Sequence, residues 1–584
     1  MKNDENKDMN RRKFLAYFSS IGLGGTLLPG VLWAQVQQQA QAQGTVQILP
    51  EMVGLAARVA DVPLSPDAQK RIADGLNRQN SLLANYKQLR DLNLGNITPF
   101  ALVFNPLLPG MKIPAARNVF KYSKPKVAKP KTDEDLAFLP VTSLAQLIRN
   151  RDIKSLDLTK LYLERLKKYD STLHFVVTLT EDLALKQAAK ADQEVAAGKY
   201  RGPLHGIPWG AKDLFAVKGY KTTFGASPYK DQVIDADATV FAKLTEAGAV
   251  LVGKLTLGAL AQGDRWFGGM TKSPWDPANP TNGSSGSSAG PASATAAGCI
   301  GFGVGTETRG SIMSPASRCG VTGLRPTFGR VSRYGAMALS WTMDKIGPLC
   351  RSAEDCALVL KAIVGPDGKD NHVIDAPFDW DASRDIKKLR VGYVKADYET
   401  EIPDDPKNPD RVQRMRDQRK LNLAALDVIK GLGINLIPIE LPKMDTAPID
   451  FVLTTEGAAA FDDLVRTDKL DLMTPEPERS SWVGSFRQHE FVPAVQYIQA
   501  NRARYKLMQT FAPVFDKVDL FIGSALGVTN LTGHPEISLP HGFDTKGQPT
   551  SLRFTGRLFG EEGLLLLAAA YQGKTEFHLK RPKL

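Results

Sequence analysis

The residues best suited to chemistry lie in a glycine- and serine-rich run, 283–311, and in an earlier apolar segment, GIPWGAKDLF, that contains Lys212. The run reads GSSGSSAGPASATAAGCIGFGVGTETRGS and ends on Ser311. Serine is a nucleophile and an unprotonated lysine is a base, so the pattern predicts a serine hydrolase that works without histidine. Small residues let backbone N–H groups approach a ligand closely, as stabilisation of an oxyanion requires.

A flexible Gly/Ser linker is the alternative interpretation of this run. Ile300, Phe302 and Val304 interrupt it, however, and the apolar, turn-punctuated segment GVTGLRPTFGRVSRYG follows it. Flexible linkers do not alternate with core residues in this way, so the composition favours a folded site.

The elements that position these residues are predicted from Leu139 onward, where helical and strand patterns alternate and indicate an α/β fold. Two amphipathic helices are predicted with Ser143 and Ser155 as their N-caps. Further helices are predicted over 181–198 and 411–431, and strands over 174–180, 249–253, 389–394 and 519–523.

The first 42 residues are predicted to be an export signal. Paired arginines at 11–12 precede an apolar run, diluted by glycine and serine, that ends at Trp33, and this resembles a twin-arginine signal. We therefore expect the twin-arginine export machinery as a partner and a periplasmic or secreted protein. Residues 40–42, Ala-Gln-Ala, offer a cleavage site, and retention as an uncleaved anchor stays open. A transmembrane helix over 14–33 is the alternative, which several glycines and a proline disfavour.

Residues 43–138 are predicted to be an accessory segment with a helix over 66–92 and a solvated lysine- and proline-rich linker over 121–131. The net charge is +12, yet no basic motif is interleaved with aromatic residues, so nucleic acid is not an expected partner.

The cysteines and histidines predict no metal site. The four cysteines lack metal-ligand spacing, and free buried thiols are expected, with a Cys350–Cys356 disulfide left open. His534 and His541 bracket the apolar segment PEISLP and either line a pocket or are structural. We expect neither a metal nor a cofactor.

Four motifs in a fixed order make residues 139–584 resemble the amidase signature family of amide hydrolases and amidotransferase subunits. They are PLHGIPWGAKDLFAVKG, GSSGSSAGPASATAAG, GTETRGSIMSPASRCGVTGLRPTFGRVSRYG and NLTGHPEISLP. The resemblance implies a single large α/β domain with a mixed β-sheet covered by helices on both faces. It also implies hydrolysis of a small-molecule or peptide amide, and it leaves a homodimer open.

The resemblance further implies a Ser–cis-Ser–Lys triad with Ser311 as nucleophile, Ser287 as proton relay and Lys212 as base. The family's spacing selects Ser287 over Ser284 and implies a cis Gly286–Ser287 peptide bond. Burial must then lower the pKa of the lysine for it to act as a base. The alternatives are a surface ion pair between Lys212 and its sequence neighbour Asp213, and a helix N-cap role for Ser311, which is compatible with catalysis.

The same resemblance assigns the backbone N–H groups of Thr308, Arg309, Gly310 and Ser311 to the oxyanion hole. Arg309 stands where the family usually has glycine, Glu307 where it has aspartate, and Ala289 also replaces a glycine. Arg309 either tolerates the local backbone conformation or points its guanidinium toward the site. Our hypothesis is that it tunes substrate choice toward carboxylate-bearing amides.

An exported amidase that works through a serine acyl-enzyme is therefore the predicted function. Three alternatives remain: the glutaminase-type A subunit of a tRNA-dependent amidotransferase, an esterase or peptide amidase, and a non-catalytic periplasmic binding protein.

Overall fold

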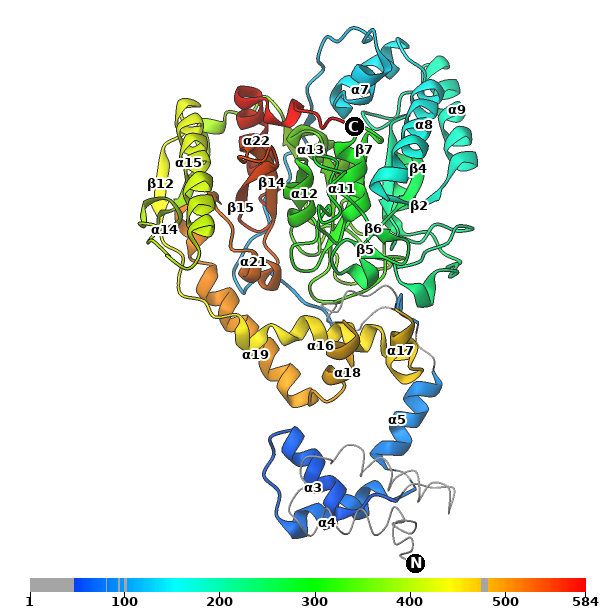
Figure 1. The fold of residues 1–584 in the computed structure, drawn as a ribbon, viewed down its shortest axis with the longest axis vertical. Helices are drawn as coiled ribbons and strands as arrows, with labels where there is room; N and C mark the ends of the chain where they lie inside the picture. The colour runs from blue at the N-terminus through cyan, green and yellow to red at the C-terminus, as the bar shows by residue number, and fades with distance from the viewer. Residues whose placement is uncertain (1–46, 80, 93–94, 99–101, 474–481) are drawn as a thin grey trace, which may run out of the picture. The chain divides into compact units, whose positions relative to one another are not determined.

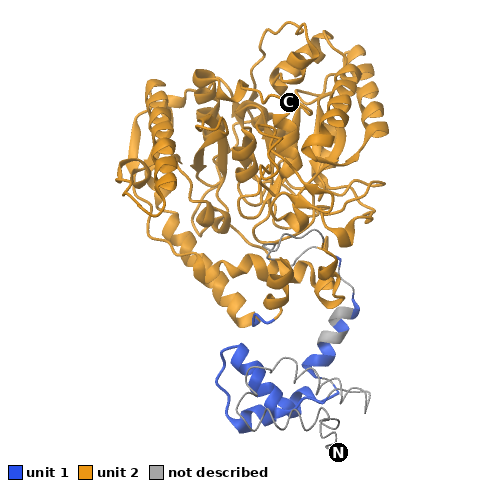
Figure 2. Ribbon diagram, viewed as in Figure 1, with its two compact units in different colours: residues 1–95, 491–493 blue, residues 96–490, 494–584 orange. Residues whose placement is uncertain are grey.

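The structure, a computed structural model, describes residues 47–584 except 80, 93–94, 99–101 and 474–481 (Figure 1). The predicted export signal, residues 1–42, lies outside the described residues. In the part that is described, no helix combines the length and the apolar character needed to cross a bilayer. The chain forms two compact units, residues 1–95 with 491–493 and residues 96–490 with 494–584 (Figure 2). The predicted accessory segment, 43–138, is thus shared between the two units.

The described part of the first unit contains α3 (Pro50–Val59), α4 (Pro66–Leu76) and α5 (Leu82–Asp91). The prediction of one helix over 66–92 is wrong, because α4 ends at Leu76 with Asn77 as its C-cap and α5 begins only at Leu82. The side chain of Asn77 accepts a hydrogen bond from Ile48 N and donates one to Ile48 O, each 2.8 Å long. This tertiary contact fixes the helix end, and the hydrophobic periodicity alone did not indicate it.

A mixed sheet of 11 strands forms the centre of the second unit. Its strands, from one edge to the other, are β12 (Leu436–Ile439), β11 (Val391–Val394), β13 (Leu520–Ile522), β15 (Pro549–Gly556), β14 (Glu536–Phe543), β8 (Thr322–Arg325), β9 (Lys345–Cys350), β7 (Phe302–Glu307), β3 (Pro208–Lys212), β4 (Val250–Leu255) and β2 (Val176–Leu179). The predicted α/β class, the mixed sheet and the four predicted strands are confirmed.

The strands around Lys212 and the glycine- and serine-rich run lie in the middle of this sheet. Strand β3 runs parallel to both β4 and β7, and β7 runs antiparallel to β9. Every residue of these four strands is buried. Since successive side chains of a strand point to opposite faces, both faces of this part of the sheet are covered.

Several helices of the second unit pack directly on the sheet: α9 packs against β4, α11 against β7, α13 against β9 and α22 against β14. In chain order the helices of this unit are α6 (Asp133–Ala137), α7 (Val141–Asn150), α8 (Ser155–Leu173), α9 (Glu181–Ala196), α10 (Thr239–Glu246), α11 (Ala289–Ala296), α12 (Met313–Cys319), α13 (Ala353–Ile363), α14 (Lys395–Glu399), α15 (Pro409–Gly431), α16 (Phe451–Ala460), α17 (Asp462–Arg466), α18 (Trp482–His489), α19 (Ala494–Phe511), α20 (Val514–Lys517), α21 (Leu526–Thr532) and α22 (Glu561–Thr575). Two-stranded pairs β1 (Phe120–Lys121) with β10 (Trp380–Asp381) and β5 (Arg265–Trp266) with β6 (Gly269–Met270) lie outside the main sheet.

The predicted N-caps of α7 and α8 are wrong. Pro140 and Lys154 occupy the cap positions, and neither contributes a side-chain cap. Instead the carboxylate of Asp192, on α9, accepts a hydrogen bond of 2.7 Å from Ser155 N. The Ser155 hydroxyl is then free to donate to Gly206 O at 2.8 Å, which ties α8 to the segment before β3.

Candidate active site

Lys212 is the last residue of β3 and its side chain is fully buried. Because β3 and β7 are parallel neighbours, their carboxyl ends lie at the same edge of the sheet, which brings Lys212 beside Thr306. Lys212 Nζ lies 2.8 Å from Ser287 Oγ, 3.1 Å from Ser288 Oγ and 2.9 Å from Thr306 Oγ1. The predicted lysine and Ser287 are therefore in direct contact.

Burial lowers the pKa of Lys212 to about 7, because its surroundings disfavour the charged ammonium. The carboxylates of Asp344 and Glu307 act in the opposite direction and favour the protonated form. A lysine in this range is partly unprotonated at neutral pH, as a base requires.

The surface ion pair considered for Lys212 and Asp213 does not form. Asp213 is also fully buried, and its partner is Lys254 of β4, whose Nζ lies 2.8 Å from Asp213 Oδ1. Thr223 N donates to the other carboxylate oxygen at 3.0 Å. Because Asp213 is paired with Lys254, it does not pair with Lys212, which contacts Ser287 and Ser288 instead.

The Gly286–Ser287 peptide bond is cis, and the turn around it is packed against backbone. A Cβ added to Gly286 would lie 1.7 Å from Gly263 O, so only glycine fits there. Ser284 does not compete for the lysine, since its hydroxyl donates to Ser285 O at 2.9 Å. The choice of Ser287 over Ser284 agrees with these contacts.

Ser311 lies beside this turn, because Ser288 N donates a 3.1 Å hydrogen bond to Ser311 O. The predicted N-cap role of Ser311 is wrong. The N-cap of α12 is Ile312, and the free N–H groups of Ile312 and Met313 donate to Glu307 Oε2 at 2.8 and 2.9 Å. Glu307 thus caps α12, the helix that follows Ser311, the predicted nucleophile.

Glu307 is in turn fixed by a fully buried arginine. Arg325 Nη1 lies 2.7 Å from Glu307 Oε1, and Arg325 Nη2 lies 3.3 Å from Glu536 Oε2 and 2.8 Å from Thr529 Oγ1. Burial alone would raise the pKa of Glu307, but the charge of Arg325, the nearby Lys345 and the hydrogen bonds from Met313 N and Arg325 outweigh it and bring this pKa to about 2.

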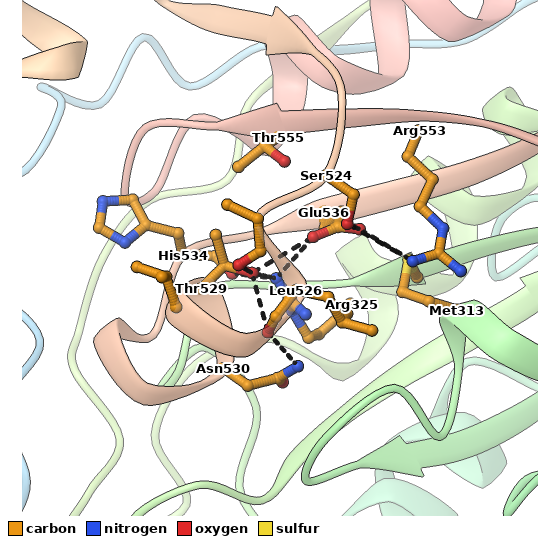
Figure 3. A network of polar contacts seen from close by, with 12 residues as sticks. Met313, Arg325, Ser524, Leu526, Thr529, Asn530, His534, Glu536, Arg553 and Thr555 are labelled. Carbon is orange, nitrogen blue, oxygen red and sulfur yellow. Dashed lines mark hydrogen bonds and ion pairs between the residues drawn. The ribbon is translucent and has the colours of Figure 1, made fainter. Parts of the chain in front are cut away.

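Figure 3 shows Arg325 reaching Glu536 and Thr529, with Ser524 and Arg553 on the far side of the Glu536 carboxylate. Glu307, and with it the start of α12, is therefore connected by buried charges to α21 and β14, two elements of the C-terminal motif.

The predicted oxyanion turn, Thr308 to Ser311, is anchored at its first residue. Thr308 Oγ1 donates to Asp344 Oδ1 at 2.6 Å, and the other oxygen of Asp344 accepts hydrogen bonds from Leu339 N and Ser340 N. Asp344 also lies in the wall of a small cavity of about 50 Å³, together with residues that include Met337 and Trp341.

Arg309 is accommodated because the left-handed position of the turn falls on its neighbour, Gly310, with φ of 93°. Its guanidinium projects outward, and Nη2 lies 3.0 Å from Asp450 Oδ2. The first alternative raised by the sequence therefore holds, since Arg309 tolerates its backbone position. The guanidinium is paired with Asp450, and a role in substrate choice stays a prediction.

The remaining predicted residues are structural in their contacts. The four cysteines are free and buried. His534 and His541 are buried, and burial lowers their pKa values to about 3 and about 4, respectively. His534 Nδ1 contacts Thr532 Oγ1 at 2.8 Å and the residue also lines a cavity. Among the described residues no three His, Cys, Asp or Glu side chains are grouped in a way that could hold a metal ion.

Sequence reasoning missed Asp344, Arg325 and Asp450. Asp344 and Arg325 lie 36 and 18 residues from the partners they hold, Thr308 and Glu307, and Asp450 lies 141 residues from Arg309. The signal that was present is the acidic Glu307, five residues before the N-cap of α12, which the sequence interpretation noted only as a replacement for aspartate.

The chain matches a known family model and several curated relatives. The family model described as Amidase matches residues 157–528. Curated relatives include the A subunit of the glutamyl-tRNA(Gln) amidotransferase of Geobacter metallireducens, 31% identical over 76% of this chain and 99% of the relative, and its counterpart in Marinomonas sp., 33% identical over 76% of this chain and 98% of the relative.

Among solved structures, the native peptide amidase from Stenotrophomonas maltophilia is 27% identical with a TM-score of 0.64, over 76% of this chain and 98% of that one. An amidase family protein from Bacillus anthracis, 24% identical, shares the fold with a TM-score of 0.67 over 77% of this chain and 93% of that one. The order of the motifs, the buried lysine beside two serines and these matches lead to one conclusion: the chain belongs to the amidase signature family of amide-hydrolysing enzymes.

Proposed function

We propose that the chain is an exported amidase that hydrolyses a carboxamide or amide C–N bond through an acyl-enzyme on Ser311, with Ser287 as proton relay and Lys212 as base. The observation that carries this proposal is the contact of 2.8 Å between the fully buried Lys212 Nζ and Ser287 Oγ. A pKa of about 7 makes the amine available as a base at neutral pH.

The hydrogen bonds around Lys212 support Ser287 as the residue that donates to the amine. A neutral amine has two N–H groups and one lone pair. Thr306 O already accepts from the Ser288 hydroxyl at 3.1 Å, so Ser288 Oγ has its lone pairs free to accept from Lys212 and from Thr306 N. In the proposed arrangement the two N–H groups of the neutral amine are directed to Ser288 Oγ and Thr306 Oγ1, and the lone pair accepts from the Ser287 hydroxyl.

In the proposed reaction, Lys212 takes the proton of Ser287 as Ser287 takes that of Ser311, and Ser311 Oγ attacks the carbonyl carbon of the amide. Backbone N–H groups of Thr308, Arg309, Gly310 and Ser311 stabilise the developing oxyanion. The C–N bond then breaks, the proton returns through Ser287 to the leaving nitrogen, and water hydrolyses the acyl-enzyme by the same relay.

The test is loss of turnover and of covalent labelling in the Ser311→Ala variant, measured on an amide library and by intact mass after treatment with a sulfonyl fluoride. Ser284→Ala is the matched control, because its hydroxyl donates to Ser285 O and does not contact Lys212. Full activity of Ser311→Ala would refute Ser311 as the nucleophile. A wild-type chain that forms no acyl-enzyme with any amide would favour a non-catalytic binding protein, and faster turnover of esters or peptide amides would favour those substrates.

A glutaminase-type amidotransferase A subunit is the second candidate, favoured by identities of 31% and 33% to such subunits. The two candidates differ in what the purified chain does alone. Amide hydrolysis by the isolated chain supports the free amidase, whereas activity that appears only with partner subunits supports the A-subunit function. Export is tested by cell fractionation of the wild type and of a variant with both arginines at 11–12 changed to lysine.

A further inference from the structure

Arg309 lies on the solvent side of the nucleophile segment. Within residues 301–313, Arg309 is exposed and Ser311 is partly exposed, whereas the other residues are buried. A ligand that approaches Ser311 from solvent therefore passes beside the Arg309 side chain.

The position of the guanidinium is fixed by one ion pair. Arg309 Nη2 lies 3.0 Å from Asp450 Oδ2, and Asp450 stands at the N-cap position of α16. A Cβ added to Gly527 would lie 4.0 Å from Arg309 Nη2 and 3.8 Å from Thr446 Oγ1. These are ordinary contact distances, so the absence of a side chain at Gly527 leaves space beside the guanidinium.

The ion pair with Asp450 leaves most of the binding capacity of the guanidinium unused. Arginine has five N–H donors in a planar fork that matches a carboxylate, and Asp450 is bound through one nitrogen. The Arg309 side chain is 42% exposed. A carboxylate can therefore bind to the open edge of the fork while Asp450 holds the other edge.

We propose that Arg309, oriented by Asp450, is a specificity-determining residue that binds a carboxylate on the substrate, so that the site prefers amides with a carboxylate a few bonds from the scissile amide. The inference rests on the proposed amidase function for the place of the reacting amide at Ser311. It assigns Asp450 a positioning role: Asp450 fixes the guanidinium and also partly offsets its charge.

The experiment measures binding to the Ser311→Ala chain by calorimetry, so that it does not depend on turnover. The three probes have the same chain length and differ at one end: glutaramic acid carries a carboxylate, pentanamide a methyl group and 5-aminopentanamide an ammonium. We expect glutaramic acid to bind roughly tenfold more tightly than pentanamide, the low end for a charge-assisted contact that is partly screened. The ammonium probe should bind most weakly.

Arg309→Gln in the same background should abolish this discrimination, and Arg309→Lys should retain part of it. Asp450→Asn keeps an acceptor for the guanidinium but removes the opposing charge, so glutaramic acid should bind more tightly still. Arg416→Gln is the matched control, since Arg416 is an arginine of similar exposure paired with an aspartate, Asp404. It should change none of the three affinities.

Equal affinities for the three probes, or an equal loss of affinity for all three in Arg309→Gln, would overturn the inference. The Arg309–Asp450 ion pair would then have only a structural role. Failure of the proposed function looks different: it would be absence of turnover in the chain that retains Ser311, whatever the probe affinities are.

Discussion

Replacement of Lys212 by methionine tests the electrostatics of the site separately from catalysis. Methionine fills a similar buried space and has no ionisable group. In the folded wild type the amine is neutral above about pH 7, whereas the unfolded lysine stays protonated up to its usual pKa of 10.5. Unfolding therefore takes up a proton between these values, and the stability of the wild type rises with pH across this window. The variant lacks this contribution.

The magnitude follows from the two pKa values of Lys212. At 1.36 kcal/mol for each tenfold change in acidity, the difference between 10.5 and about 7 destabilises the folded wild type by about 5 kcal/mol in acid. About 4 kcal/mol of this remains at pH 7 and about 2 kcal/mol at pH 9. Methionine removes this penalty but loses the hydrogen bonds to Ser287, Ser288 and Thr306, worth about 1 kcal/mol each. The variant should therefore be close to the wild type in stability at neutral pH and inactive.

The assay is urea unfolding of both chains at about pH 7 and about pH 9, with turnover measured on the same samples. The stability of the wild type relative to the variant should increase by about 2 kcal/mol between the two conditions. Lys254 and Lys345, whose pKa values burial also lowers, contribute to both chains and cancel in the difference. If the difference in unfolding free energy between the two chains does not change with pH, the lowered pKa of Lys212 is refuted. Turnover by the Lys212→Met variant would refute Lys212 as the base.

Glu307→Gln removes the charge that holds Arg325, so the unfolding free energy should fall by roughly 3–5 kcal/mol in urea denaturation, with a loss of turnover; an unchanged midpoint would contradict the pairing. Lys254→Met should lower the unfolding free energy by a similar amount, because Asp213 stays buried without its cation. Adding Asp213→Leu should recover most of this loss, and a double variant no more stable than Lys254→Met would contradict the pairing. Gly310→Ala puts a side chain at φ of 93° and should lower the unfolding free energy by about 1–2 kcal/mol. It should reduce kcat while changing KM less, and an unaltered kcat would argue against a role for this turn in catalysis.

Features encoded in local sequence were predicted well. Strand β4 was visible as a short apolar run, and its residues are all buried. The register that selects Ser287 over Ser284 came from motif spacing, and Lys212 contacts Ser287; the role of Ser287 as relay stays a prediction. These features depend on residues close together in sequence or on a fixed order of motifs.

Features that depend on tertiary partners were missed or predicted wrongly. Ser155 and Ser311 have the side chains of good N-caps, yet Asp192 and Glu307 provide the acceptors instead. A charged carboxylate accepts a stronger hydrogen bond than a hydroxyl, so an acid brought near a helix start by the fold displaces the local cap. Hydrophobic periodicity contains no information about such long-range acceptors.

Asp344 interacts with both the proposed base, Lys212, and the proposed oxyanion turn, residues 308–311. Its charge favours the protonated form of Lys212, and burial favours the neutral form, so the base has a pKa of about 7 as the result of two opposing effects. The same carboxylate accepts the Thr308 hydroxyl bond that anchors the oxyanion turn. A base whose pKa lies near the working pH transfers protons efficiently in both directions, as formation and hydrolysis of an acyl-enzyme require. Asp344, itself held by Leu339 N and Ser340 N, and Glu307 are the two carboxylates that partly offset the effect of burial on the Lys212 pKa.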